Sequence, residues 1–586
     1  MLNFLKYTLA TIVGTLLTFL LLFFIIIGIV SIASKNEPVA VKPNSILELK
    51  IDKMVQEREP VNPFAQFDMG ESSSIQGLDK IKAVIKKAKD DKDINGIYID
   101  AGLFVGGGLA TIEEIRQELI EFKKSGKFIV AYGENYSQLS YYLASVADKI
   151  YLNPLGMIDF KGINGQVTFF KNALDKLEVE MQIIRGPNNK FKSAVEPFMD
   201  EKMSEANREQ TSIFLGSIWN HILTNVSKSR KIEVAELQTI ANNLSAFHAE
   251  SALKSGLIDG LKYWDEMETE LNKLNKSDTT KKPEFISMAK YKETIKPDIK
   301  QKDKIAIIYA VGAIQSGEGD DQTIGSERIA KAIRVARNDS TIKAVVFRIN
   351  SPGGSAQASE VIYRELELLK KEKPLVASMG DYAASGGYYI ACNADRIFAQ
   401  PNTLTGSIGV FGMIPNMQKL LNNKLGITFD GVKTAENADI FSLNKPLSPF
   451  QFETIRNSID IIYQTFIQHV ADGRNMTTTQ VDSIGQGRVW SGVDALKIGL
   501  VDELGNIDAA INHAAKLAKI ENFRIKELPI QKDPFEEIID QLNGKTSIKE
   551  AINEEFGAFA EYIQFLKSID NQDRIQARLP FILHIE

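Results

Sequence analysis

Serine and glycine residues in two neighbouring stretches of the chain have the types and settings that nucleophilic chemistry requires. Ser385 lies in GDYAASGGYY, directly after a predicted strand and among small residues that would let another backbone come close. Its hydroxyl could act as an exposed nucleophile, or it could simply cap the helix that follows. Upstream, INSPGGSA places two glycines at a strand-to-helix turn, where N–H groups of Gly354 or Gly353, with that of Gly386, could stabilise an oxyanion.

A serine nucleophile needs a base, and the chain offers histidine and lysine. None of the five histidines lies in a repeated or glycine-flanked setting, so a Ser-His-Asp triad stays open but unsupported; they are His221, His248, His469, His513 and His584. Lys192 lies in FKSAVEPF, an apolar stretch limited by proline. To act as a base near neutral pH, its pKa must fall by about 3 units from ~10.4, which burial can cause. The alternative is a surface lysine whose stem lies on Phe191.

These stretches belong to different copies of a repeated unit. Residues 133–154 (GENYSQLSYYLASVADKIYLNP) align without a gap with residues 380–401 (GDYAASGGYYIACNADRIFAQP), and Ser385 falls opposite Gln138. ALKSGLID and ALKIGLVD form a second matched pair further along. The region of the second copy that matches Lys192 holds no lysine, so one copy supplies the serine and the other the lysine. The sequence therefore predicts different chemical roles for the two halves.

Helix and strand patterns alternate in both copies. In the first, apolar residues at helical spacing predict a helix over residues 77–90, followed by a strand over residues 94–100. The second copy repeats this order with SERIAKAIRVARND and IKAVVFRIN. Strands that alternate with helices predict a largely parallel, helix-covered sheet, so the expected fold class is α/β.

Composition divides the chain into five parts. They are an apolar N-terminal segment (1–35), a first repeat (36–275), a linker rich in Lys, Asp and Thr (276–303), a second repeat (304–525) and a tail with two amphipathic helix patterns (526–586). The net charge of −6 gives no reason to expect a nucleic-acid partner, which would require a clustered basic face.

The apolar segment predicts a membrane anchor. Residues 7–34 are 28 consecutive uncharged residues, whereas about 20 suffice to cross the hydrocarbon layer. A cleaved signal peptide is the alternative, but its apolar stretch is usually shorter, and no A-x-A-like site precedes Lys35. Lys6 on one side and Lys35 with Lys42 on the other leave the orientation undecided by charge, and we expect the body to lie outside the cytoplasm.

Four motifs in this order, FKSAVEPF, SPGG, GDYAASGGYY and TLTGSIGVFG, resemble the signal peptide peptidase A (protease IV) family in its long, duplicated form. The resemblance implies tandem ββα repeats of the crotonase and Clp-protease type behind an N-terminal transmembrane helix. It implies a Ser/Lys-dyad serine protease in which Ser385 is the nucleophile, Lys192 the general base and Ser407 the hydroxyl that orients the lysine. Gly354 and Gly386 match the oxyanion positions.

The same resemblance implies the setting in which the chain works. Its substrates would be signal peptides and other apolar peptides, its other partner the lipid bilayer, and its assembly a homotetramer. The expected location is the bacterial inner (cytoplasmic) membrane with the catalytic part on the periplasmic side, and neither metal nor nucleotide would be required as a cofactor.

Two other functions stay open at this point. A crotonase-type acyl-CoA enzyme also uses backbone N–H groups on a carbonyl, although it usually needs a positioned carboxylate. A catalytically inactive scaffold at the membrane is the second alternative, because the first copy has lost the serine. Replacing Ser385 by alanine separates a protease from a scaffold.

Overall fold

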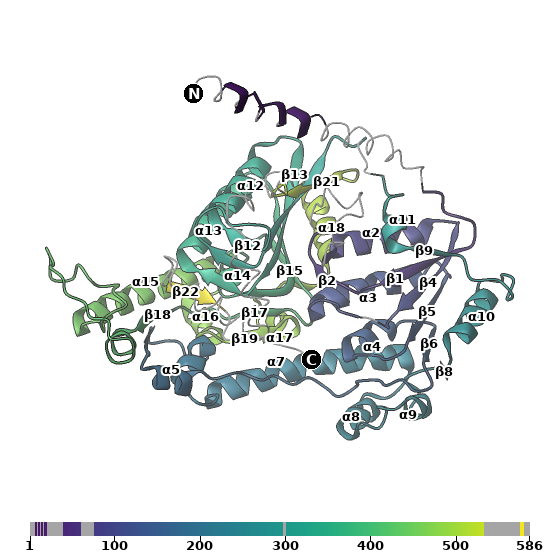
Figure 1. Cartoon of the computed structure of the whole chain (residues 1–586), viewed down its shortest axis with the longest axis horizontal. Coiled ribbons are helices and arrows are strands. Elements are labelled where there is room, and N and C mark those ends of the chain that lie inside the picture. The colour runs from purple at the N-terminus through teal and green to yellow at the C-terminus, as the bar shows by residue number, and fades with distance from the viewer. Residues whose placement is uncertain are drawn as a thin grey trace.

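The computed structural model describes residues 39–59, 75–102, 104–296, 300–531 and 575–578, together with residues 6–8, 10, 11, 13–15, 17–19 and 21. Figure 1 shows two units with helices packed around sheets. The sheet of the first half, purple to blue, lies on the right of the view, and the second half, teal to green, lies mainly at the centre and left, while blue α5 and part of α7 extend to the lower left beneath it.

The first unit is built on a six-stranded parallel sheet. Its strand order is β8-β6-β5-β4-β1-β9, and every neighbouring pair is parallel. The strands are β1 (Ser45–Lys50), β4 (Ile94–Asp100), β5 (Phe128–Gly133), β6 (Lys149–Leu152), β8 (Gly260–Leu261) and β9 (Phe285–Ser287), with a separate pair β2 (Met54–Gln56) and β3 (Ile75–Gly77). The central strands β4 and β5 are buried over most of their length, as expected of parallel strands covered by helices.

The helices of the first half pack on this sheet, on one another or on the third sheet described below. They are α2 (Leu78–Asp90), α3 (Leu109–Lys123), α4 (Gln138–Ala144), α5 (Lys171–Leu177), η1 (Ser193–Val195), α6 (Glu196–Met199), α7 (Glu205–Arg230), α8 (Val234–Asn243), α9 (Ala249–Lys254), α10 (Trp264–Leu274) and α11 (Met288–Lys292). In α2 the buried residues Ile81, Val84 and Ile85 share one face, and the backbone becomes extended at Asp91. The helix and strand predicted over residues 77–90 and 94–100 are confirmed as α2 and β4.

The second unit repeats this arrangement. Its main sheet has the order β19-β17-β15-β13-β10-β21, with β16 paired to β15 and β20 to β16. The strands are β10 (Lys304–Val311), β13 (Ile342–Ser351), β15 (Leu375–Ala384), β16 (Arg396–Ala399), β17 (Leu404–Gly406), β19 (Val489–Ser491), β20 (Glu503–Leu504) and β21 (Arg524–Leu528). The helices are α12 (Ser326–Asn338), α13 (Ala356–Lys370), α14 (Gly386–Tyr389), η2 (Leu420–Lys424), α15 (Pro449–Arg474), α16 (Thr478–Ile484), α17 (Gly492–Lys497) and α18 (Ile507–Ala518).

Corresponding helices of the two units have equal lengths. α2 and α12 both have 13 residues, α3 and α13 both have 15, and α7 and α15 both have 26. The duplication and the α/β class that the sequence predicted are therefore confirmed.

A third sheet joins the two halves. Its order is β12-β11-β14-β22-β18-β7, with β12 (Thr323–Gly325), β11 (Ala313–Gln315), β14 (Gly353–Ser355), β22 (Ile575–Arg578), β18 (Phe411–Asn416) and β7 (Glu180–Arg185). β7 comes from the first half but pairs antiparallel with β18 of the second. Helix α7 follows β7 along the chain and runs along the lower edge of the view in Figure 1. The first half thus delivers a strand and the loop after it to the second unit.

A buried cluster of charges also holds the units together. Arg348 from β13 lies 2.9 Å from Glu57 and 2.8 Å from Glu114 of the first half. Glu114 in turn pairs with Lys82 at 2.5 Å, and Lys82 pairs with Asp508 of α18 at 2.9 Å. Buried charges of this kind are tolerated only as pairs, so the cluster requires both units to be docked.

Three expectations about the chain's segments have different outcomes. Residues 276–303, expected as a linker, contain β9 and α11, because the apolar run at Phe285–Ser287 extends the first sheet beside β1. The two amphipathic patterns of the tail lie outside the described residues, whereas Ile575–Arg578, placed in a helical tail by the sequence, form strand β22. No helix among the residues that the structure describes is long and apolar enough to cross a membrane, and most of residues 7–34 fall outside that description.

Candidate active site

Ser385 lies at the junction between β15 and α14. Its φ of 56° and ψ of −115° are rare for a residue other than glycine, and such conformations cluster at functional sites. Hydrogen bonds fix the turn on both sides, because Ser385 N donates to Gly406 O (2.8 Å) and Tyr389 N donates to Ser385 O (2.8 Å). The side chain is fully buried.

Lys192 lies in the loop that leads from β7 to η1. The loop is bound to the second unit, since Phe191 N donates to Gln486 O at 2.9 Å. Gln210 of α7 links the same two segments, because its amide donates to Phe191 O (2.9 Å) and its carbonyl oxygen accepts from Val489 N (3.1 Å). The lysine from the first copy is thereby held within the second.

The structure brings Lys192, Ser385 and Ser407 together within one chain. Lys192 Nζ lies 2.9 Å from Ser385 Oγ, 3.0 Å from Ser407 Oγ and 3.1 Å from Ser407 O. A neutral amine has two N–H groups and one lone pair. If both N–H groups donate to the two oxygens of Ser407, the lone pair faces the Ser385 hydroxyl, which is the arrangement that a general base needs.

Burial lowers the pKa of the Lys192 amine well below its ordinary value, because the side chain is only 1% exposed. No ion pair with a carboxylate opposes this effect within the described part of the chain. Glu196, four residues away, is engaged elsewhere, since it accepts hydrogen bonds from Ser204 Oγ (2.6 Å) and Asn207 Nδ2 (2.7 Å). The site therefore favours a neutral amine that can accept a proton.

Ser407 lies between β17 and β18 and is itself held in an unusual conformation. Its φ is 49°, and its N–H donates to Arg488 O at 2.7 Å. The residue is fully buried. Because both its hydroxyl and its carbonyl reach the same amine, Ser407 limits the directions in which Lys192 Nζ can point.

The glycines expected at the oxyanion position lie next to Ser385. A methyl group built on Gly386 would lie 3.2 Å from Gly354 N, and one built on Gly353 would lie 2.9 Å from Gly386 N. The N–H groups of Gly354 and Gly386 are therefore close neighbours, and side chains at Gly353 or Gly386 would enter the space between the two segments. Two adjacent backbone donors beside a serine can stabilise developing negative charge.

In the first copy, Gln138 fills the place that Ser385 holds in the second. Its side-chain oxygen accepts from Lys161 N (3.1 Å) and Gly162 N (2.9 Å), and its amide donates to Gly162 O (2.9 Å). The side chain is buried, and its hydrogen bonds hold the loop at Lys161 and Gly162 in place. The first copy thus has a hydrogen-bonded structural glutamine at the position where the second copy has Ser385.

The described histidines make no hydrogen bond to the three residues of this site. His221 lies 3.4 Å from Glu113, and His469 lies 3.0 Å from Glu360. None of the described histidines hydrogen bonds to Ser385, and His584 lies outside the described residues.

The sequence reasoning missed the residues that hold the lysine loop, namely Gln210, Gly487 and Arg488. The Arg488 guanidinium lies 4.5 Å from the ring centroid of Phe191, and Gly487 packs on the backbone of Lys192. The sequence signal for these residues is the GQGR segment between two helical patterns. It predicts a turn, but it does not indicate that the turn contacts the loop of Lys192.

Comparisons with known proteins identify the family to which the chain belongs. The model of peptidase family S49 matches residues 121–278 and 367–521, one segment in each copy. Protease 4 of Salmonella typhi is 40% identical over 478 residues, which cover 80% of this chain and 76% of that protein. Protease 4 of Haemophilus influenzae is 38% identical over 448 residues, 74% of this chain and 72% of that protein.

Two further matches extend the comparison. The chloroplastic serine protease SPPA of Arabidopsis thaliana is 34% identical over 442 residues, 74% of this chain and 64% of that protein. A solved structure of a ClpP1 mutant from Listeria monocytogenes aligns with a TM-score of 0.24 and 15% identity over 34% of this chain and 91% of that chain. Because the family model matches both copies and the two Protease 4 relatives extend over most of the sequence, the chain belongs to peptidase family S49, as a long, duplicated signal peptide peptidase A.

Proposed function

We propose that the chain is a membrane-anchored serine endopeptidase with a Ser/Lys dyad. The observation that carries this proposal is the Lys192 amine, which is buried, unpaired with any described carboxylate and 2.9 Å from Ser385 Oγ. Burying a lysine amine disfavours its charged form and lowers the stability of the fold. A lysine that is buried without a carboxylate partner is therefore more typical of a functional site than of a structural one.

In the proposed reaction, neutral Lys192 accepts the hydroxyl proton as Ser385 Oγ attacks a peptide carbonyl carbon. The N–H groups of Gly354 and Gly386 stabilise the oxyanion, and Ser407 keeps the amine aimed at the hydroxyl. Lys192 then returns the proton to the leaving amine. A water molecule, deprotonated by the same amine, hydrolyses the acyl-enzyme and frees Ser385. This chemistry requires neither metal nor nucleotide.

The proposed substrates are signal peptides and other apolar peptides. This part rests on the family resemblance and on relatives that are named Protease 4 and SPPA. The same resemblance supports a homotetramer, which the mass of the detergent-solubilised protein would test.

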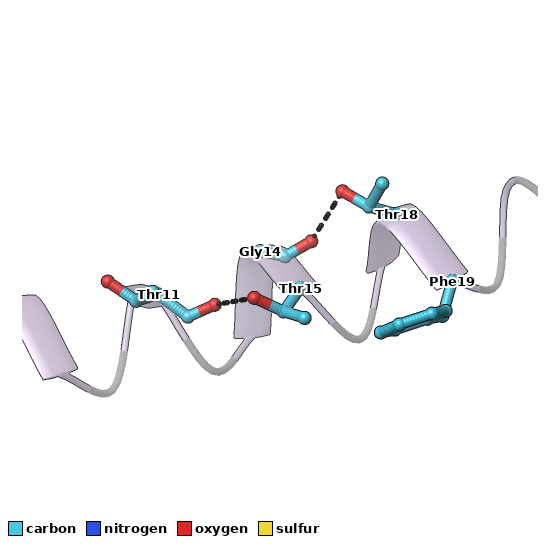
Figure 2. Close-up of a pocket in the computed structure, with 5 residues that line it drawn as sticks. All are labelled: Thr11, Gly14, Thr15, Thr18 and Phe19. Carbon is cyan, nitrogen blue, oxygen red and sulfur yellow. Dashed lines mark hydrogen bonds between the residues drawn. The ribbon is translucent and has the colours of Figure 1, made fainter.

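The proposal places the chain in the bacterial inner membrane, with the catalytic part on the periplasmic side and an anchor near residues 7–34. Described residues of this segment are compatible with a lipid environment. Figure 2 shows the hydroxyls of Thr15 and Thr18 donating to the carbonyls of Thr11 and Gly14, both at 2.8 Å. Such bonds leave no hydroxyl proton unsatisfied in an apolar surrounding. Retention of the full chain in carbonate-washed membranes, and its digestion by protease added to the periplasmic side only, would test the anchor and its orientation.

The central experiment compares wild type, Ser385→Ala and Lys192→Met on an apolar peptide ester and on a synthetic signal peptide. Both variants are expected to lose hydrolysis. Ser137→Ala is the matched control, because Ser137 only caps α4 of the first copy by accepting from Ser140 N (3.2 Å). Equal hydrolysis by wild type and Ser385→Ala would refute the proposal, and turnover of a CoA thioester instead of peptides would favour the acyl-CoA alternative.

A further inference from the structure

The two backbone N–H groups assigned to the oxyanion come from different segments of the second unit. Gly354 lies in β14, shortly before helix α13, and Gly386 is the first residue of helix α14. A methyl group built on Gly386 would lie 2.8 Å from Ser359 Oγ of α13 and 3.2 Å from Gly354 N, so the two segments are in close contact. The spacing of the two donors therefore depends on how α13 and α14 are held together.

A hydrogen bond links these two helices one turn further along. The Tyr389 hydroxyl of α14 donates to Glu360 Oε2 of α13. Tyr389 is only 2% exposed, and burial raises the pKa of its hydroxyl, so this group stays protonated and able to donate. The backbone N–H of Tyr389 donates to Ser385 O at 2.8 Å, which connects the same residue to the serine of the dyad.

His469 of α15 completes this link. Its Nε2 lies 3.0 Å from the same oxygen of Glu360, and its ring stacks on Tyr363 of α13 with the centroids 3.9 Å apart. The ring of Tyr389 packs edge-on against both rings, with its centroid 5.3 Å from that of His469 and 5.7 Å from that of Tyr363. The hydrogen bond with His469 lowers the pKa of the Glu360 carboxyl, so the carboxylate is kept as an acceptor.

The first copy has the same combination of side chains. Tyr142 donates to Glu113, and His221 Nε2 lies 3.4 Å from Glu113 Oε2. The two glutamates occupy the fifth position of α3 and α13, which have equal lengths. The two tyrosines lie four residues after Gln138 and Ser385, the positions that the duplication aligns. The cluster thus belongs to the duplicated fold, but only in the second copy does it adjoin Ser385.

We propose that Glu360 is a positioning residue of the reaction, which holds α14 against α13 through Tyr389 and so fixes the spacing of the two oxyanion donors. This inference rests on the proposed function. The Glu360 side chain is 48% exposed and acts through Tyr389, so it is not a catalytic residue. Because the oxyanion forms in the transition state, a change in the spacing of its donors should alter kcat much more than KM.

The test measures kcat and KM of the full chain for an apolar peptide ester in wild type, Glu360→Ala, Glu360→Gln and Tyr389→Phe. Glu360→Ala and Tyr389→Phe each remove the link and should lower kcat by roughly two- to tenfold, the range that one hydrogen bond supplies, with KM nearly unchanged. Glu360→Gln keeps an oxygen that accepts from the tyrosine and should restore most of kcat. The double variant with both Glu360→Ala and Tyr389→Phe should be no slower than either single variant, because both changes break the same bond.

A peptide aldehyde supplies a second readout. The Ser385 oxygen bonds to the aldehyde carbon, its proton passes to Lys192, and the carbonyl oxygen becomes an anion beside the two donors. Glu360→Ala should therefore weaken binding of the aldehyde by the same factor as it lowers kcat. The corresponding peptide alcohol forms no such adduct, so its affinity should not change.

The first copy provides the matched control. Tyr142→Phe removes the equivalent hydroxyl beside Glu113, and it should leave kcat unchanged because no nucleophile follows from that helix. Thermal unfolding checks that every variant is folded. Tyr389→Phe loses a single oxygen atom, so it carries the test should Glu360→Ala fail to fold.

The outcomes separate this inference from the proposed function. Wild-type kcat in Glu360→Ala and Tyr389→Phe, an effect confined to KM, no rescue by Glu360→Gln, or an equal fall in Tyr142→Phe would each overturn the positioning role and leave the protease intact. Absence of ester hydrolysis by wild type itself would overturn the proposed function together with this inference.

Discussion

Gly487 packs directly on the backbone of Lys192. A methyl group built on Gly487 would lie 2.5 Å from Lys192 Cβ and 2.6 Å from both Lys192 Cα and Lys192 N. The φ of Gly487 is 82°, so glycine is favoured there by conformation as well as by space. The position of the proposed base therefore depends on a residue of the second copy that has no side chain.

Replacing Gly487 by alanine should displace Lys192 and impair hydrolysis. A shift of about 1 Å in a reacting group can lower the rate by on the order of 10²-fold. Gly126→Ala is a close control, because its φ is 79° but a methyl group there meets nothing within 4 Å. Both variants should lose about 1–2 kcal/mol through backbone strain, but only Gly487→Ala should lose activity. Equal kcat values for the two would contradict this role of Gly487.

The buried amine predicts a pH-dependent cost to stability. Since the folded-state pKa of Lys192 is lowered, the unfolded chain binds more protons between that value and ~10.4. The cost is fully present below the lowered pKa and disappears as pH rises through the ordinary value of an unfolded lysine. Each unit of lowering corresponds to about 1.4 kcal/mol.

Lys192→Met should remove this cost while abolishing the base. Urea unfolding at neutral pH should find Lys192→Met more stable than wild type, with the difference shrinking as pH approaches ~10.4, the ordinary lysine value. Hydrolysis should fall by about 10²–10⁴-fold, the usual contribution of a general base. In wild type the rate should rise with pH as the amine loses its proton. A variant less stable than wild type at neutral pH would show that the amine is not held neutral.

Ser407→Ala should make the orientation of the Lys192 amine less well defined, while the amine itself remains in place. Loss of one hydrogen bond of about 1.4 kcal/mol corresponds to roughly tenfold in rate. Because Ser407 O still accepts from Lys192 Nζ, part of the orientation remains. We expect the effect in kcat, with KM nearly unchanged, because Ser407 contacts the base rather than the peptide. An effect confined to KM would instead place Ser407 in substrate binding.

The elements of each unit were predictable because their signals are local. The helix Leu78–Asp90 follows from apolar residues at helical spacing, and the strand Ile94–Asp100 follows from a short run of residues typical of strands. The duplication follows from comparing the chain with itself. The motif around Ser385 was visible for the same reason, as small residues lie next to it in the sequence.

The meeting of the two copies was not predictable from spacing. Lys192 and Ser385 are 193 residues apart, and they meet because β7 crosses to pair with β18. Such pairing depends on long-range register, which no local pattern reports. The strand at Ile575–Arg578 was missed for a similar reason, since four residues become a strand only between two existing edges.

Asp381 links strand β15, which leads to Ser385, to helix α3 of the first unit through hydrogen bonds. Its removal should weaken the contact between the two units and the positioning of Ser385. It lies in β15, four residues before Ser385, and accepts from Ala110 N (2.8 Å), Thr111 N (3.0 Å) and Thr111 Oγ1 (2.6 Å) at the start of α3. Ala110 and Thr111 are buried, so water cannot replace the lost acceptor.

Asp381→Ala should therefore destabilise the protein by about 1–3 kcal/mol, the cost of buried donors left without partners. Asp278→Ala is the matched control, because Asp278 also accepts from a threonine N–H and hydroxyl, those of Thr280, but is exposed. Thermal unfolding should distinguish the two, and hydrolysis should fall only in Asp381→Ala, since β15 positions Ser385. Equal melting temperatures for the two variants would show that the cap on α3 does not hold the units together.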